Sequence, residues 1–169
     1  MKIAPFPLGL LLLLAACAPR LDWREARPAG AGVLALFPCK PELERRELPA
    51  PPGAARLNMG LAACKAGGLS FSLAWAEMAE PAQVGPALAQ MRDSLAQRLH
   101  ARAAAAEPLR VPGMTPHPQA LQQALTGEAQ QARVAVFARG LQVYQAVMLG
   151  PRTDAEAWET FVTSLRLDI

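Results

Sequence analysis

The sequence predicts an α+β domain in which an antiparallel sheet of about five to six strands is covered by two helices. Three observations support this prediction. In residues 69–75 a heavy apolar residue alternates with a small or polar one, which is the period of a strand with one buried face. From residue 84 the apolar period changes to three and four residues, as in a helix that packs on a sheet. The pair Arg139-Gly140 separates two further apolar runs and predicts a hairpin.

The first apolar run, residues 3–18, is too short for a membrane span, which needs roughly 20 apolar residues. A positive charge at Lys2, an apolar core and then small residues are typical of a secretory signal. The sequence Leu14-Ala15-Ala16-Cys17 resembles the lipobox of bacterial lipoproteins. The resemblance implies that the chain is cut before Cys17 and that Cys17 carries lipid. The alternative is an ordinary signal peptide that contains a cysteine.

These features divide the chain into a lipoprotein signal peptide (residues 1–16), a lipidated N-terminus with a tether (residues 17–31) and a single α/β domain (residues 32–169). The tether is polar, has no period and would reach on the order of 20 Å. Trp23 within it would pack on the domain edge or lie at the membrane interface. Ala18 stands where a retention signal usually has Asp, so the lipoprotein resemblance favours the periplasmic face of the outer membrane over the inner membrane.

The chain has three cysteines, and Cys39 and Cys64 remain once Cys17 is lipidated. In an oxidising compartment an even pair predicts a disulfide, with Cα atoms closer than about 7 Å. The alternative is two buried, unpaired thiols. If the strands that precede these cysteines paired as antiparallel neighbours, their ends would lie at opposite edges. The disulfide therefore requires another strand order.

The first half of the domain alternates short strands with proline-rich turns. Residues 32–38 form an apolar run that ends at Pro38, and the charged segment that follows predicts a loop with one short strand. The remaining strands and the helix follow in order: 44–48, a hairpin of 56–64 and 69–77, and a helix of 84–99 prolonged by alanines to residue 106.

The second half predicts an irregular segment, a hairpin and a closing helix. Residues 109–125 hold several prolines and no period, so they predict a long loop. The hairpin strands are expected at 133–138 and 141–149. Thr153 and Glu156 have the spacing of a capping box, in which the Thr153 hydroxyl bonds the N–H of Glu156. An apolar stripe that includes Trp158 and Phe161 then predicts the helix.

The order of these elements resembles the PsbP-like α/β/α fold and its bacterial relatives. The resemblance rests on Phe37-Pro38 at the first strand end, the helix at 84–99, the segment Arg139–Pro151 and the closing Phe-x-x-Ser-Leu-Arg-Leu from Phe161. It implies an antiparallel sheet between helices. It also implies an assembly factor or a binding module, and it maps no catalytic residue.

The sequence gives little sign of catalysis. Its two histidines, His100 and His117, have no Cys, His or acidic neighbour at metal-ligand spacing, so no metal site and no cofactor is expected. The nucleophile-elbow motif is absent. The formal net charge is only +3 and the arginines are not clustered, which argues against nucleic-acid binding.

The favoured function is a non-enzymatic binding, assembly or maintenance module, anchored to the membrane by lipid on Cys17 and facing a protein partner in the cell envelope. A small envelope hydrolase and a carrier of a small apolar ligand stay open as alternatives. Loops at the sheet ends are the expected binding surfaces. The candidate residues are Lys40 and Glu42 after the first strand, and Arg110, Met114 and His117 in the irregular segment.

Overall fold

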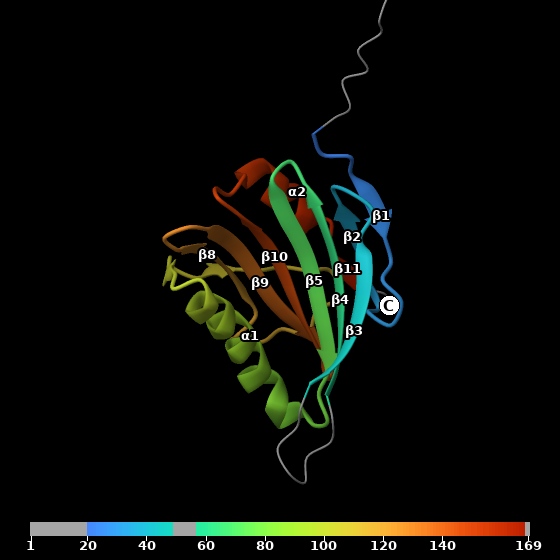
Figure 1. The fold of residues 1–169 in the computed structure, drawn as a ribbon. Helices are drawn as coiled ribbons and strands as arrows, with labels where there is room; N and C mark the ends of the chain where they lie inside the picture. The colour runs from blue at the N-terminus through green and yellow to red at the C-terminus, as the bar shows by residue number, and fades with distance from the viewer. Residues whose placement is uncertain (1–19, 49–56, 168–169) are drawn as a thin grey trace, which may run out of the picture.

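The computed structural model describes residues 20–48 and 57–167. The lipobox and Cys17 lie outside these residues. The main body is an eight-stranded antiparallel sheet with the order β3-β4-β5-β10-β9-β8-β6, in which β7 also pairs with β8 (Figure 1). The strands are β3 (Glu42–Leu48), β4 (Leu57–Ala66), β5 (Leu69–Glu77), β6 (Arg102–Ala103), β7 (Glu107–Pro108), β8 (Leu121–Thr126), β9 (Gln131–Arg139) and β10 (Gln142–Gly150).

A second, three-stranded sheet has the order β1-β2-β11, with β1 (Arg24–Ala26), β2 (Val33–Phe37) and β11 (Arg166–Leu167). The expected α+β class and antiparallel sheet are confirmed, but the expectation of five to six strands is too low. The surplus strands are mostly two or three residues long, which is too short to show a period of two. The predicted hairpins, the first strand and the short strand within the charged loop are all present.

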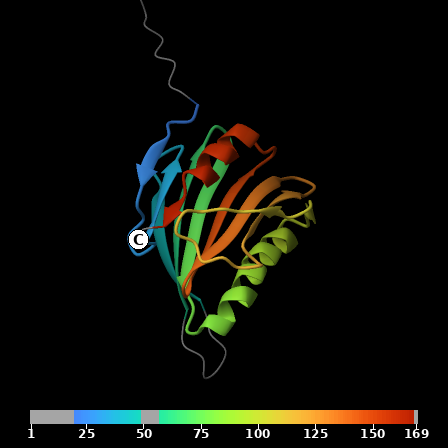
Figure 2. The same ribbon diagram turned by 180° about the vertical axis from the view of Figure 1, so that it is seen from behind.

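The large sheet is covered on both faces. The α1 helix (Val84–Arg98), preceded by the 3-10 turn η1 (Pro81–Gln83), lies across one face (Figure 1). The α2 helix (Ala155–Thr163) and the small sheet lie on the other face, where the segment between β7 and β8 crosses in front of the sheet (Figure 2). Each face encloses its own hydrophobic core.

Alternation along β5 assigns its side chains to the core on the α2 face. Leu69, Phe71, Leu73 and Trp75 all belong to this core, which confirms the heavy apolar face that the sequence predicts. On the opposite face, α1 buries its predicted stripe against the valines of β9 and β10. Both faces of the sheet are therefore largely apolar, and the polar Gln145 in the middle of β10 donates a hydrogen bond to the Met91 carbonyl of α1 at 2.7 Å.

The α1 helix ends earlier than the sequence predicts, since residues 101–106 do not continue it. His100 takes a left-handed conformation, with φ of 47°. The N–H of His100 donates to the Gln97 carbonyl at 3.1 Å, and that of Ala101 donates to Ala96 at 2.9 Å. These two bonds are the Schellman motif that closes a helix. Alanine propensity is overridden because the chain then pairs with β8 as β6 and β7.

The α2 helix is present, but its predicted cap is wrong. Asp154, not Thr153, is the N-cap residue, and its side chain accepts a hydrogen bond from the N–H of Ala157 at 3.0 Å. The backbone N–H of Thr153 instead donates to Gln131 Oε1 at 3.3 Å. Thr153 is thereby tied to the sheet, and the helix begins one residue later than the capping-box spacing suggests.

The position of the cap predicts a difference between two neighbouring variants. Asp154→Ala is expected to lower the free energy of unfolding by about 1 kcal/mol, because it removes the acceptor for the Ala157 N–H. Thr153→Ala is the matched control and should cost less than about 0.5 kcal/mol. Urea unfolding followed by circular dichroism measures both. A larger loss for Thr153→Ala would instead support Thr153 as the N-cap residue of a capping box.

The segment 109–125 is not a free loop. Its last residues form β8, and Leu109 and Val111 are buried in the core on the α2 face. The carbonyl of Pro112 accepts a hydrogen bond from the N–H of Leu167 at 2.9 Å, which joins the segment to β11. Its prolines remove backbone donors, so the segment packs through side chains where a regular strand would pair.

Residues 20–31 also differ from the expected tether. The Asp22 N–H donates to the Pro38 carbonyl at 3.0 Å, and β1 pairs with β2. Trp23 packs edge-on against Phe71, with ring centroids 5.9 Å apart, so it takes the first of its two expected places. The ordered body therefore begins at least as early as Arg20, and a tether from Cys17 would be far shorter than the sequence suggests.

Candidate functional site

The predicted disulfide is present in the structure. Cys39 and Cys64 are bonded, and their Cα atoms are 6.0 Å apart, within the limit set from the sequence. The different strand order that this bond requires is also present, because β2 belongs to the small sheet while β4 lies in the large one. The bond therefore ties the two sheets together next to the end of β2.

Lys40 and Glu42 follow the disulfide and are both exposed. Glu42 opens β3 and pairs with Ala63, one residue before Cys64. This corner lies toward the β4–β5 turn.

The other three candidates are spread over the irregular segment. Arg110 is exposed, whereas Met114 and His117 are half-buried. Met114 Sδ accepts the N–H of Val111 at 3.2 Å, and His117 Nδ1 accepts the N–H of Gln119 at 3.0 Å. Met114 and His117 thus shape the segment itself.

The structure does not bring the two groups of candidates together. The neighbouring Thr115 accepts the N–H of Gly140 at 3.0 Å, in the turn between β9 and β10. This turn and the β4–β5 turn lie at opposite ends of the sheet, because β5 runs from one to the other. Below, the end of the sheet with the β9–β10 turn is called the groove end, and the end with the β4–β5 turn is called the anchor end. At about 3.3 Å per residue, β5 separates them by about 25 Å.

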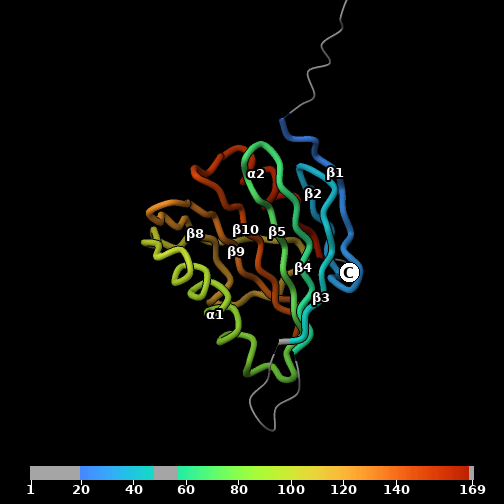
Figure 3. The backbone as a smooth tube through the Cα atoms, viewed as in Figure 1, coloured from blue at the N-terminus to red at the C-terminus, as the bar shows by residue number. Residues whose placement is uncertain are grey.

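A groove of about 300 Å³ lies at the groove end and is lined by residues of β3, β4 and β5. Figure 3 shows these three strands side by side in the large sheet. Its floor is a row of cross-strand neighbours in β3, β4 and β5: Arg45, Gly60 and Trp75. A Cβ atom at Gly60 would lie 2.2 Å from two atoms of the Trp75 ring. Only glycine leaves room for the indole, which lies flat over the β4 backbone and fills the space that a side chain would take.

The wall of the groove comes from the turn between β1 and β2. Arg45 Nη2 donates to the Ala29 carbonyl at 3.1 Å, and Gln142 Nε2 donates to the Gly30 carbonyl at 3.0 Å. The Tyr144 hydroxyl lies 2.8 Å from the Ala31 carbonyl and 2.9 Å from Gln142 Oε1. These contacts hold the small sheet over the end of the large one.

The rim of the groove is polar and carries both signs of charge. Arg46, Glu47, Asn58 and Glu77 line it, together with the thioether of Met59. Arg46 is bonded to Glu44 on β3, with Nη2 to Oε2 at 2.7 Å. The arrangement offers hydrogen-bond donors and acceptors around an aromatic floor, which is suited to binding.

Sequence reasoning did not single out this site. The apolar face of residues 69–75 predicts Trp75 in the core, and Arg45 and Glu47 fall in the short strand expected at 44–48, for which the sequence indicates no binding role. The signal that could have found the groove is Gly60 within a predicted strand, since such a glycine often marks a close approach by another group. Gln142 gave no signal, because its role depends on the β1–β2 turn.

Among the residues that the structure describes, no group of three or more His, Cys, Asp or Glu side chains could hold a metal ion. None of the helices in the same residues is long and apolar enough to cross a membrane. No protein-family model matches the chain, and no curated protein is significantly similar to it in sequence.

Proposed function

We propose that the protein is a lipid-anchored binding module of the cell envelope that presents the groove at Trp75 to a protein partner. One observation carries the proposal: the chain enters the fold at the end opposite the groove. Arg20 Nε and Nη2 donate to the carbonyl of Gly67, in the β4–β5 turn, at 3.2 and 2.6 Å. An anchor at Cys17 would hold this end near the bilayer and turn the groove away from it.

The length of the connection supports this orientation. Only Ala18 and Pro19 lie between Cys17 and Arg20, so the Cα atoms of Cys17 and Arg20 are at most about 11 Å apart. The groove lies about 25 Å farther along β5. A lipid on Cys17 would therefore leave the groove open to the periplasm.

The composition of the groove supports a protein as the partner. Trp, Met and Arg are enriched in protein–protein binding sites, and Trp75, Met59, Arg45 and Arg46 line the groove together. Opposite charges on the rim give an approaching chain a defined register.

The alternatives find less support in the structure. A carrier needs an apolar cavity between the sheet and a helix. Fully buried side chains fill both interfaces, among them Leu88 of α1 and Phe161 of α2. A hydrolase needs a nucleophile with a base, or two carboxyl groups close together. Among the described residues that line the groove there is no Ser, Thr, Cys or His, and the carboxyl groups of Glu47 and Glu77 stand on β3 and β5 with β4 between them.

The finer fold assignment is part of the same proposal: the body is a PsbP-like sandwich. Its support is the placement of α1 and α2 on opposite faces of an antiparallel sheet, with Phe37-Pro38 at the end of β2. Assembly and maintenance roles follow from that resemblance.

The proposal predicts photo-crosslinking from one end of β4. A benzoylphenylalanine at Asn58, which is exposed on the groove rim, should capture a protein in intact cells. The same probe at Lys65, which is exposed on the same strand at the anchor end, should not capture it. Mass spectrometry of the purified native protein should also find Cys17 as the lipidated N-terminus.

Two charge reversals decide whether the captured protein occupies the groove. Arg45→Glu should lower capture from Asn58 at least tenfold, because it reverses a charge on the floor. Arg166→Glu, at an exposed arginine of β11, is the matched control and should leave capture unchanged. Equal capture in both variants, or an unmodified Cys17, would contradict the proposal.

A further inference from the structure

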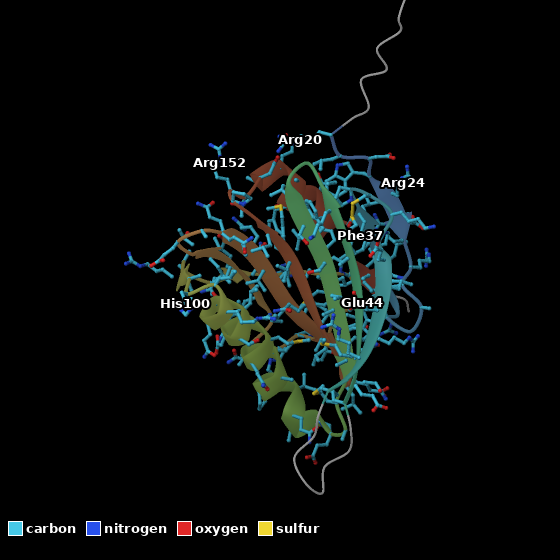
Figure 4. All side chains as sticks on the ribbon, viewed as in Figure 1. Arg20, Arg24, Phe37, Glu44, His100 and Arg152 are labelled. Carbon is cyan, nitrogen blue, oxygen red and sulfur yellow. A yellow bond between two sulfur atoms is a disulfide. The ribbon has the colours of Figure 1, made fainter. Side chains whose placement is uncertain are left out.

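Exposed cations gather at the anchor end of the molecule. Lys65 is exposed just before the β4–β5 turn, and Arg20 is bonded to that turn through the Gly67 carbonyl. Arg152 follows β10. A Cβ atom at Gly150 would lie 3.2 Å from the Gly68 carbonyl oxygen, so the end of β10 is in contact with the β4–β5 turn. Arg20 and Arg152 lie at the same end of the molecule (Figure 4).

These three side chains form no ion pair with any residue in the described part of the chain. The carboxylates close to them in sequence have other contacts or positions. Asp22 is paired with Arg24, Asp154 caps α2, and Glu156 lies in the first turn of that helix. The charges of Arg20, Lys65 and Arg152 are therefore available to a surface outside the molecule.

We infer that Arg20, Lys65 and Arg152 form a docking surface for the anionic headgroups of the bilayer that holds the lipid anchor. The inference rests on the proposed anchoring at Cys17. The chain itself identifies the occupant, because Arg20 is three positions after Cys17 and its Cα atom lies within about 11 Å of the Cys17 Cα atom. At that distance, close to one Debye length, charge attraction to phosphates remains effective.

Contact between the docking surface and the bilayer would fix the orientation of the domain. A lipid anchor alone does not fix the tilt of the domain relative to the bilayer. Each cation at an anionic surface favours the docked orientation about fivefold, so three together favour it on the order of 100-fold. Docking by this end directs the opposite end, with the groove, away from the membrane.

The test couples the predicted mature chain, residues 17–169, to a maleimide lipid through Cys17. Because Cys39 and Cys64 are bonded to each other, Cys17 provides the free thiol. A gadolinium chelate on other lipid headgroups then broadens amide resonances according to their distance from the bilayer. In phosphatidylcholine vesicles that contain phosphatidylglycerol, the amide of Gly68 should be broadened far more than that of Gly140. In pure phosphatidylcholine the difference should shrink to what the anchor at Cys17 imposes without docking.

Substitutions at the cations complete the test. In anionic vesicles the variant Arg20→Gln, Lys65→Gln, Arg152→Gln should show a difference between Gly68 and Gly140 no larger than the difference in pure phosphatidylcholine. Lys65→Gln with Arg152→Gln, which keeps the Arg20–Gly67 contact, should weaken the orientation on the order of 25-fold. The matched control removes three other cations at Arg110, Arg139 and Arg166, and it should leave the difference intact.

Two results would overturn the inference: equal broadening at Gly68 and Gly140 in anionic vesicles, or the same loss in the control variant. Because chemical coupling replaces lipidation here, a failure to find lipid on Cys17 in cells would count against the proposed function alone. Loss of capture at Asn58 would likewise leave the orientation result standing.

Discussion

Replacing both bonded cysteines, as Cys39→Ala with Cys64→Ala, is expected to lower the free energy of unfolding by about 3 kcal/mol. The disulfide closes a loop with a sequence separation of 25, and its removal returns that loop's conformational entropy to the unfolded chain. Chemical denaturation of the oxidised protein and of the variant measures the difference. The double substitution avoids leaving one thiol unpaired.

Reduction of the natural protein provides the control for this prediction. The reduced protein should unfold at nearly the same denaturant concentration as the double alanine variant, because both lack the same constraint. If the oxidised and reduced forms unfold together, the bond does not stabilise the fold.

The sequence predicts the central elements of the fold because their patterns are long. Residues 69–77 repeat the period of a strand several times, and α1 shows its apolar stripe over four turns. The turn after Arg139 is a two-residue hairpin loop in which Gly140, with φ of 56°, supplies the first central position. Local chemistry decides each of these features, so the sequence is enough.

The elements that the sequence misses depend on pairing with another strand. β1 forms because β2 offers an edge, and β11 pairs with the other edge of β2. The alanines after α1 favour a helix locally, but residues on both sides of them pair with β8 as β6 and β7. In each case hydrogen bonds to another strand outweigh a small local propensity.

The groove could be predicted only in part for the same reason. Its floor is a row across β3, β4 and β5, and only the register of β4 with β5 follows from the two-residue turn at Gly67-Gly68. Its wall is the β1–β2 turn, which belongs to a segment whose composition predicts a tether. A single sequence cannot place that turn over Trp75, because nothing in its own residues requires the contact.

Phe161→Ala is expected to lower the free energy of unfolding by about 3–5 kcal/mol, the largest effect of any change proposed for this chain. The ring is fully buried in the core on the α2 face. It contacts three other aromatic rings edge-on: Phe37 at 5.2 Å, Phe71 at 5.5 Å and Trp158 at 6.2 Å between centroids. Truncation leaves a cavity between two sheets and a helix, and paired strands collapse poorly into such a space.

The matched control for this variant lies on the same helix. Glu159→Ala removes an exposed side chain from α2 and should change stability by less than about 0.5 kcal/mol. Urea unfolding of both variants measures the contrast. A loss below about 1 kcal/mol for Phe161→Ala would mean that the core on this face is not packed as the structure shows.

The disulfide and the Phe161 ring close the same gap, so their effects should not add. Phe37, which the ring contacts, is two residues from Cys39, while Phe71 pairs with Cys64 in the sheet. Without the disulfide, the small sheet can move toward the cavity that Phe161→Ala leaves, and the truncation should then cost less. A double-mutant cycle in urea should give a coupling energy above about 0.5 kcal/mol. Additive losses would show that each tie holds the two sheets independently.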